Sequence, residues 1–232
     1  MKLLTKIKNK IKGLQKKDLN LIRLIQTHNI DCILDVGANV GQYATYLRKI
    51  GYTGKIISFE PISSNIKILK KKAALDSAWD IYPQTAVGDS VGTVEINVSN
   101  ASDMSSILDL KEETLAALPN SKYIKKESVS LTSIDVIFND LLKNYKNIYL
   151  KVDTQGFEAA VLKGAEKSLP KITGIQLELS LLPLYEGEVT FEKIIADLIK
   201  KGFETFMILP GYFSKKINRQ LQSDFILFKP SK

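Results

Sequence analysis

Short apolar runs alternate with amphipathic segments along most of the chain. The runs at 31–36, 55–60 and 147–153 are rich in Ile, Leu and Val and have no period of two, as is typical of strands that are buried on both faces. The segments between and after them change to helical spacing, with apolar residues three or four positions apart. The expected helical stripes lie at 40–47, 62–73 and 191–199. This order predicts a parallel sheet with helices on both faces.

Three regions depart from this alternation. Two β-like runs within 79–98 are separated by a glycine-containing turn, which predicts a strand followed by an added hairpin strand. Residues 99–128 are rich in Ser, Asn and Asp at their ends, so we expect a loop or lid with one short helix. Near the C-terminus, the runs at 203–209 and 225–228 have no helix between them, which predicts an antiparallel pair.

The length and charge of the chain fit one α/β domain with a distinct N-terminus. At 232 residues and 44% hydrophobic content the chain can bury a continuous core, and we divide it into a lysine-rich N-terminal helix at 1–17 and a domain at 18–232. Residues 1–17 hold seven of the 33 basic residues and no acid, which leaves 26 basic against 25 acidic residues in the domain. In spite of the net charge of +8, a nearly neutral domain argues against a nucleic-acid partner.

The N-terminal lysines leave two interpretations open. The helix at 1–17 either docks on the domain with its lysines in water or lies on an anionic membrane surface, because its leucines and isoleucines fall close to one stripe. No stretch approaches the roughly 18 apolar residues of a membrane span, and no apolar block of a signal peptide is present. The single cysteine, Cys32, lies in an apolar run, so we expect no disulfide. These features predict a cytoplasmic protein, with peripheral contact at the inner membrane surface as the alternative.

A glycine-containing loop follows the first predicted strand, as in folds that bind nucleotide-like ligands. The segment from Asp35 to Gly41 places Gly37, Ala38 and Asn39 in a tight turn before a helix. Its glycine spacing differs from the GxGxxG of dinucleotide folds. A carboxylate at Asp35 would repel a pyrophosphate but attract the ammonium and sulfonium groups of S-adenosylmethionine, so the charge favours that methyl donor.

Glu60 ends the second predicted strand, where an acid can accept hydrogen bonds from both hydroxyls of a ribose. Pro61 stops the strand, and Asn65 follows in the first turn of the next helix. The residues assigned to cofactor binding are therefore Asp35, Gly37, Ala38, Asn39, Gly41, Glu60, Pro61 and Asn65.

The sequence resembles the FkbM-type methyltransferases from about residue 20 onward. The blocks that carry the resemblance are DVGANVGQYATYLRK (35–49), ISFEP (57–61), AVGDSVGTVEINVS (86–99), SDMSSIL (102–108), LKVDTQGFEAAVLKGAEKSL (150–169), IQLELSLLPLYEG (175–187) and SDFILF (223–228). Of these, LKVDTQGFE and LYEG are the more specific, because DVGANVG recurs across many methyltransferases. The N-terminal lysine segment lies outside the resemblance.

The resemblance implies a class I methyltransferase fold, which is Rossmann-like. Its seven-stranded mixed sheet has the order 3-2-1-4-5-7-6, with strand 7 antiparallel. It also implies O-methylation of sugars or of hydroxyls on natural products. The positions that match the family's pattern are Asp35, Gly37, Asn39, Gly41, Glu60 and Asp153.

Three carboxylates are expected to meet at the carboxyl edge of the predicted sheet. Asp153 ends one strand, Glu178 lies near the end of the next, and Asp224 begins an expected antiparallel strand at the same edge. An alcohol must lose its proton when it is methylated, so we assign Asp153 as the general base or as the acid that orients the cofactor, with Glu178 and Glu158 as further candidates. A divalent metal held by Asp153, Glu178 and Asp224 is chemically reasonable but not favoured. His28 precedes the first strand and is interpreted as structural.

Aromatic residues at the same edge are candidates for the acceptor site. Tyr185, and Tyr212 with Phe213, fall on expected loops there, where they either stack on a sugar ring or only cover the core. We therefore predict an S-adenosylmethionine-dependent O-methyltransferase that acts on a hydroxylated small molecule or glycan. The alternatives are an RNA or protein methyltransferase and a module that binds S-adenosylmethionine without turnover. A nicotinamide-dependent oxidoreductase is disfavoured by Asp35 and the glycine spacing.

Overall fold

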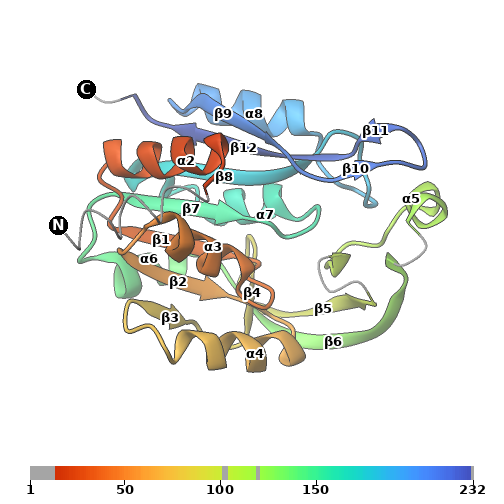
Figure 1. Ribbon diagram of the computed structural model, residues 1–232. Coiled ribbons are helices and arrows are strands. Elements are labelled where there is room, and N and C mark those ends of the chain that lie inside the picture. The colour runs from red at the N-terminus through yellow and green to blue at the C-terminus, as the bar shows by residue number, and fades with distance from the viewer. Residues whose placement is uncertain (1–13, 101–103, 119–120, 231–232) are drawn as a thin grey trace.

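The computed structural model describes residues 14–100, 104–118 and 121–230, and its centre is a mostly parallel sheet (Figure 1). The sheet consists of β3 (Trp79–Ile81), β2 (Lys55–Phe59), β1 (Cys32–Val36), β7 (Ile148–Val152), β8 (Ile172–Ser180), β12 (Gln222–Phe228) and β9 (Glu204–Pro210), in that spatial order. Numbered among themselves along the chain, these strands follow the order 3-2-1-4-5-7-6, and β12 is antiparallel to both of its neighbours. The α/β class with a parallel-rich central sheet is confirmed.

The described residues contain more strands than the single seven-stranded sheet that was predicted. Two smaller sheets, of three and two strands, are added to the central one. The first contains β4 (Thr85–Val87), β6 (Tyr123–Thr132) and β5 (Gly92–Ser99), and the second contains β10 (Phe213–Ser214) and β11 (Arg219–Gln220). The second sheet is a short hairpin inserted between β9 and β12.

Helices cover both faces of the central sheet, as the periodicity predicts. One core cluster receives side chains from α2 (Lys16–Thr27), α3 (Gln42–Ile50) and α4 (Ser63–Ala73). The other receives them from α6 (Ile134–Leu142), α7 (Glu158–Lys163) and α8 (Phe191–Lys200). The strands are buried on both faces because their side chains alternate between the two clusters; in β1, Leu34 and Val36 enter one and Ile33 the other.

The hairpin expected within 79–98 is wrong. The strands β4 and β5 do not pair with each other, because β6 lies between them, parallel to β4 and antiparallel to β5. Residues 123–128, which were expected to be loop, are therefore the first part of a strand. That part is largely exposed and charged, so it lacks the apolar alternation by which a strand is recognised. The one short helix expected in the lid is present as α5 (Glu112–Ala117).

The N-terminal helix predicted at 1–17 lies mostly outside the described residues. Lys16 and Lys17 form the first turn of α2, so the boundary predicted after residue 17 falls inside a helix. Asp18 closes that turn, since its side chain accepts a 2.8 Å hydrogen bond from the Gln15 backbone N–H. Within the part of the chain that the structure describes, no helix is long and apolar enough to cross a bilayer.

Candidate active site

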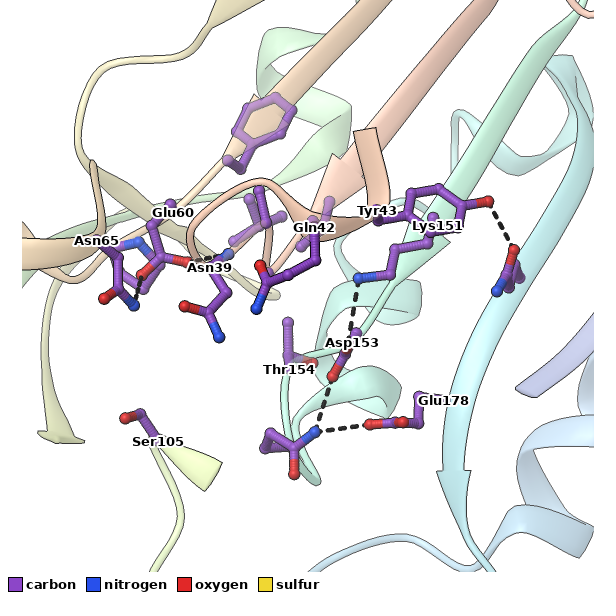
Figure 2. Close-up of a pocket in the computed structure, with 18 of the residues that line it drawn as sticks. Asn39, Gln42, Tyr43, Glu60, Asn65, Ser105, Lys151, Asp153, Thr154 and Glu178 are labelled. Carbon is purple, nitrogen blue, oxygen red and sulfur yellow. Dashed lines mark hydrogen bonds and ion pairs between the residues drawn. The ribbon is translucent and has the colours of Figure 1, made fainter. Parts of the chain in front are cut away.

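A pocket of about 390 Å³ lies beyond the carboxyl ends of β1, β2 and β7, where open α/β sheets bind their ligands. Figure 2 shows Glu60 and Asn65 on one side of it and Lys151, Asp153 and Glu178 on the other. The predicted site residues that line this pocket are Gly37, Ala38, Asn39, Glu60, Pro61, Asn65, Asp153, Glu178 and Asp224.

The loop after β1 is held against two neighbouring strands. The backbone N–H groups of Gly37 and Ala38 both donate to the carbonyl of Phe59, at 3.1 and 3.0 Å. Gly37 has a φ of +79°, and a Cβ there would lie 1.8 Å from the backbone oxygen of Asp153. The position therefore needs glycine for the close approach of β1 and β7, as well as for any approach of a ligand.

Gly41 has a packing role rather than a place on the pocket wall. Its φ is +82°, and a Cβ would meet the side chains of Trp79 and Leu69 at 2.7 and 2.8 Å. Because these side chains fill the space at its Cα, the assignment of Gly41 to direct cofactor contact has no support in the geometry.

Glu60 organises one side of the pocket. Its carboxylate accepts hydrogen bonds from the backbone N–H of Asn39 at 2.7 Å, from that of Ile62 at 2.9 Å and from the side-chain amide of Asn65 at 3.2 Å. Burial raises the pKa of Glu60 to about 7, although these hydrogen bonds oppose the shift. The structure thus brings together Asn39, Glu60 and Asn65, as predicted.

Asp35 lies behind the pocket wall, in a buried polar row that crosses the sheet. The strand register places Ser58, Asp35, Lys151 and Gln176 side by side on β2, β1, β7 and β8. Ser58 donates to Asp35 at 3.0 Å, and the Lys151 ammonium lies 3.5 Å from its other oxygen. Burial raises the pKa of Asp35, and Lys151 opposes that shift. The carboxylate of Asp35 therefore faces a lysine and is not part of the pocket wall, so its assignment to direct cofactor contact has no support in the geometry.

The acidic side of the pocket is a network of carboxylates and donors. Asp153 accepts from Lys151 at 3.2 Å and from the Gln155 side-chain amide at 2.8 Å, and the same amide donates to Glu178 at 2.8 Å. Burial alone would lower the pKa of the fully buried Lys151, but Asp153, Asp35 and Glu178 together raise it. The charge of Asp153, followed by burial and by Asp224, raises the pKa of Glu178.

Asp224 joins the same edge from β12, where it pairs in register with Glu178. Its carboxylate accepts a 2.9 Å hydrogen bond from Gln176, whose amide oxygen accepts from Tyr43 at 2.7 Å. The predicted meeting of Asp153, Glu178 and Asp224 is confirmed. However, amide and ammonium donors lie among these carboxylates, and the described residues contain no group of His, Cys, Asp and Glu arranged to hold a metal ion.

Comparison with known proteins identifies the family of this fold and pocket. The model of the methyltransferase FkbM domain matches residues 35–205. The chain belongs to the FkbM methyltransferase family. No curated protein sequence matches it.

Solved structures resemble the FkbM domain at low sequence identity. Methyltransferase FkbM from Methylobacillus flagellatus KT has a TM-score of 0.53 and 14% identity, over 84% of this chain and 43% of that one. TehB from Haemophilus influenzae has a TM-score of 0.47 and 12% identity, over 94% and 63%. Aeropyrum pernix fibrillarin, solved with natively bound S-adenosyl-L-methionine, has a TM-score of 0.46 and 11% identity, over 85% and 66%. The chain thus covers less than half the length of the first of these proteins, and about two thirds of the other two.

The three aromatic residues predicted for the acceptor site do not line the pocket. Tyr185 is fully buried, and its hydroxyl donates to the side-chain oxygen of Gln155 at 2.8 Å. It therefore cannot stack on a sugar ring in this conformation. Tyr212 and Phe213 are about half exposed, at 45% and 47%, and neither is part of the pocket wall. Phe213 begins β10, and Tyr212 directly precedes it at the base of the β10–β11 hairpin.

The remaining candidates have structural contacts. Glu158 accepts hydrogen bonds from the backbone N–H groups of Thr154 and Gly156, so it fixes the loop after β7, and burial raises its pKa to about 7. His28 stacks on Phe228 with ring centroids 4.0 Å apart, consistent with a structural role. Cys32 is buried and forms no disulfide.

Three residues of the FkbM domain's pocket were missed in the sequence. Lys151 lies inside a strand that is buried on both faces. A charged residue at such a position is almost always paired, so the sequence alone could have indicated a buried partner of opposite charge. Gln155 and Tyr43 carry no comparable signal, because their importance comes from contacts with β8 that only the fold creates.

Proposed function

We propose that this FkbM-family domain transfers a methyl group from S-adenosylmethionine to a hydroxyl group of a sugar, a glycan or a small-molecule natural product. The proposal rests on the observation that two different sets of polar residues line opposite sides of one pocket. Glu60 with its asparagines lies on one side, and Asp153 with Glu178 lies on the other. A nucleoside-binding carboxylate and a proton acceptor are the two groups that such a transfer requires.

The residues on the Glu60 side fit the nucleoside half of this cofactor. The carboxylate of Glu60 and the amides of Asn39 and Asn65 offer acceptors to ribose hydroxyls. An apolar wall lies next to them and suits the flat face of an adenine ring. That wall is formed by Pro61, Ile62, Ala86, Val87, Ile96 and Ile107.

The residues on the acidic side fit the reacting end. When bound, S-adenosylmethionine supplies an electrophilic methyl group on a sulfonium, whose positive charge carboxylates attract. In such a transfer the acceptor oxygen would lose its proton as it gained the methyl group, and Asp153 would accept that proton. Asp153 suits this role because its side chain is 30% exposed, whereas Lys151 beside it is only 6% exposed.

Two measurements test the proposal. Calorimetry of the purified protein with S-adenosylmethionine and S-adenosylhomocysteine should show binding, and Glu60→Ala should weaken it. Mass spectrometry of glycan and natural-product mixtures, incubated with the protein and labelled methyl donor, should then reveal a labelled O-methyl product. Binding without any methylated product would indicate a module that binds the cofactor without turnover. A labelled RNA or protein would show that the acceptor belongs to a different class from the one proposed. Absence of cofactor binding would refute the proposal.

A further inference from the structure

Gln155 bridges the two carboxylates of the acidic side with one amide group. The residue follows β7, has a φ of +56° and is 7% exposed. Its side-chain nitrogen lies 2.8 Å from Oδ1 of Asp153 and 2.8 Å from Oε2 of Glu178. A primary amide has two N–H groups, so one is available for each carboxylate. The amide therefore bridges two carboxyl groups that also lie within hydrogen-bond reach of each other.

The orientation of this amide is set from both ends. Its oxygen accepts from the Tyr185 hydroxyl at 2.8 Å and from the Gln222 side-chain amide at 3.3 Å. The reverse orientation would turn the oxygen toward two carboxylates and the N–H groups toward the donor nitrogen of Gln222. The buried Tyr185 also packs against Gly156, where a Cβ would meet its ring at 2.8 Å, so the hydroxyl has little freedom to move.

The charges around the two acids differ. Asp153 has the Lys151 ammonium at 3.2 Å in addition to the amide of Gln155, and the acids near it are Glu178, Asp35, Glu158 and Asp224. Among the described residues, the amides of Gln155 and Gln222 donate to Glu178, the latter at 3.4 Å. The charges of Asp153 and Asp224 disfavour the ionised form of Glu178, and that of Lys151 favours it. The amide donors therefore carry much of the compensation for a negative charge on Glu178.

We propose that Gln155 is a positioning residue whose amide stabilises the ionised form of Glu178 beside Asp153. Each carboxylate receives one N–H of the same amide, which lowers the cost of placing two negative charges next to each other. The meaning of this bridge for catalysis rests on the proposed function, whereas the effect of the amide on Glu178 does not.

Carboxyl ¹³C NMR of the protein without cofactor or acceptor tests this arrangement directly. Glu178→Gln assigns the glutamate resonance that titrates above the ordinary range. Gln155→Met keeps the length of the side chain and removes both donors, which destabilises the doubly ionised pair. The titration midpoint of Glu178 should therefore rise by about one pH unit or more. Tyr185→Phe keeps the ring and frees the amide to turn, so it should produce a smaller rise in the same direction.

Tyr52→Phe is the matched control. It also removes a tyrosine hydroxyl that donates to an oxygen, here the carbonyl of Lys55, but at the other end of the sheet, and it should leave the Glu178 midpoint unchanged. If Gln155→Met does not fold, Tyr185→Phe carries the test. An unchanged or lowered Glu178 midpoint in whichever of these two variants is folded overturns the proposal.

The two proposals fail separately. If the Glu178 midpoint shifts as expected but the protein methylates no hydroxyl, the role of Gln155 is supported and only the proposed function is refuted. When an acceptor is found, Gln155→Met should shift the pH dependence of kcat while the Kd for S-adenosylmethionine stays within about twofold. A merely structural change would lower activity equally at every pH.

Discussion

The backbone N–H of Asn39 donates a 2.7 Å hydrogen bond to the carboxylate of Glu60, which ties the loop after β1 to the end of β2. Because Glu60 also accepts hydrogen bonds from Ile62 and Asn65, one buried carboxylate organises this whole side of the pocket. Removal of this carboxylate should therefore take away a hydrogen-bond acceptor for a ligand and also disturb the pocket wall that the carboxylate holds in place.

Glu60→Ala should weaken S-adenosylmethionine binding by about 1.5 to 3 kcal/mol, the range for hydrogen bonds that involve a charged group. Isothermal titration calorimetry measures the change. Glu127→Ala is a matched control, because Glu127 also accepts from a backbone N–H at the start of α4, that of Ser63 at 3.0 Å, but is not part of the pocket wall. Equal affinities in wild type and Glu60→Ala would remove Glu60 from the cofactor site.

The affinity for S-adenosylmethionine should depend on pH because the pKa of Glu60 is raised to about 7. A raised pKa means that the carboxyl is neutral below about pH 7 and ionised above it, and the ionised form is the better acceptor for ribose hydroxyls. Affinity should thus increase by about tenfold between roughly pH 6 and pH 8. Glu60→Gln, which cannot ionise, should bind weakly with a flatter profile in the same calorimetric series. A wild-type profile that falls over this interval would contradict the assignment.

Gly37→Ala should destabilise the fold by about 2 to 5 kcal/mol, since it adds a left-handed φ penalty to a collision with the backbone of Asp153. Gly51→Ala isolates the first term. Its φ of +108° is equally unfavourable for a side chain, yet a Cβ there meets nothing within 4 Å, so the expected cost is about 1 to 2 kcal/mol. Urea unfolding followed by circular dichroism gives both values. Similar values for the two variants would show that the backbones after β1 and β7 can move apart at little cost in stability.

The sequence predicted those parts of the fold whose signal is local. The buried strands and the helical stripes of α3, α4 and α8 have the expected apolar spacing, and Glu60 lies at a strand end that many ligand sites share. What it could not predict depends on register and on long-range pairing. The orientation of Asp35 toward Lys151 follows from the pairing of β1 with β7. The burial of Tyr185 follows from its β-bridge to Leu110, far away in the sequence.

The last prediction separates a general base from a metal site on the acidic side of the pocket. Asp153→Asn keeps the size of the side chain and its contact with Gln155 but removes the proton acceptor. Turnover of a hydroxyl acceptor should therefore fall by roughly 10²- to 10⁴-fold, while the Kd for S-adenosylmethionine changes little. Asp224 lies on the same edge but is bound to Gln176, so Asp224→Asn should reduce turnover much less. A metal held by both residues would make the two variants similarly inactive and would make the wild type sensitive to chelation. Initial rates with and without chelator, measured at saturating cofactor, distinguish these cases, and a wild-type rate in Asp153→Asn would show that the acidic side is structural.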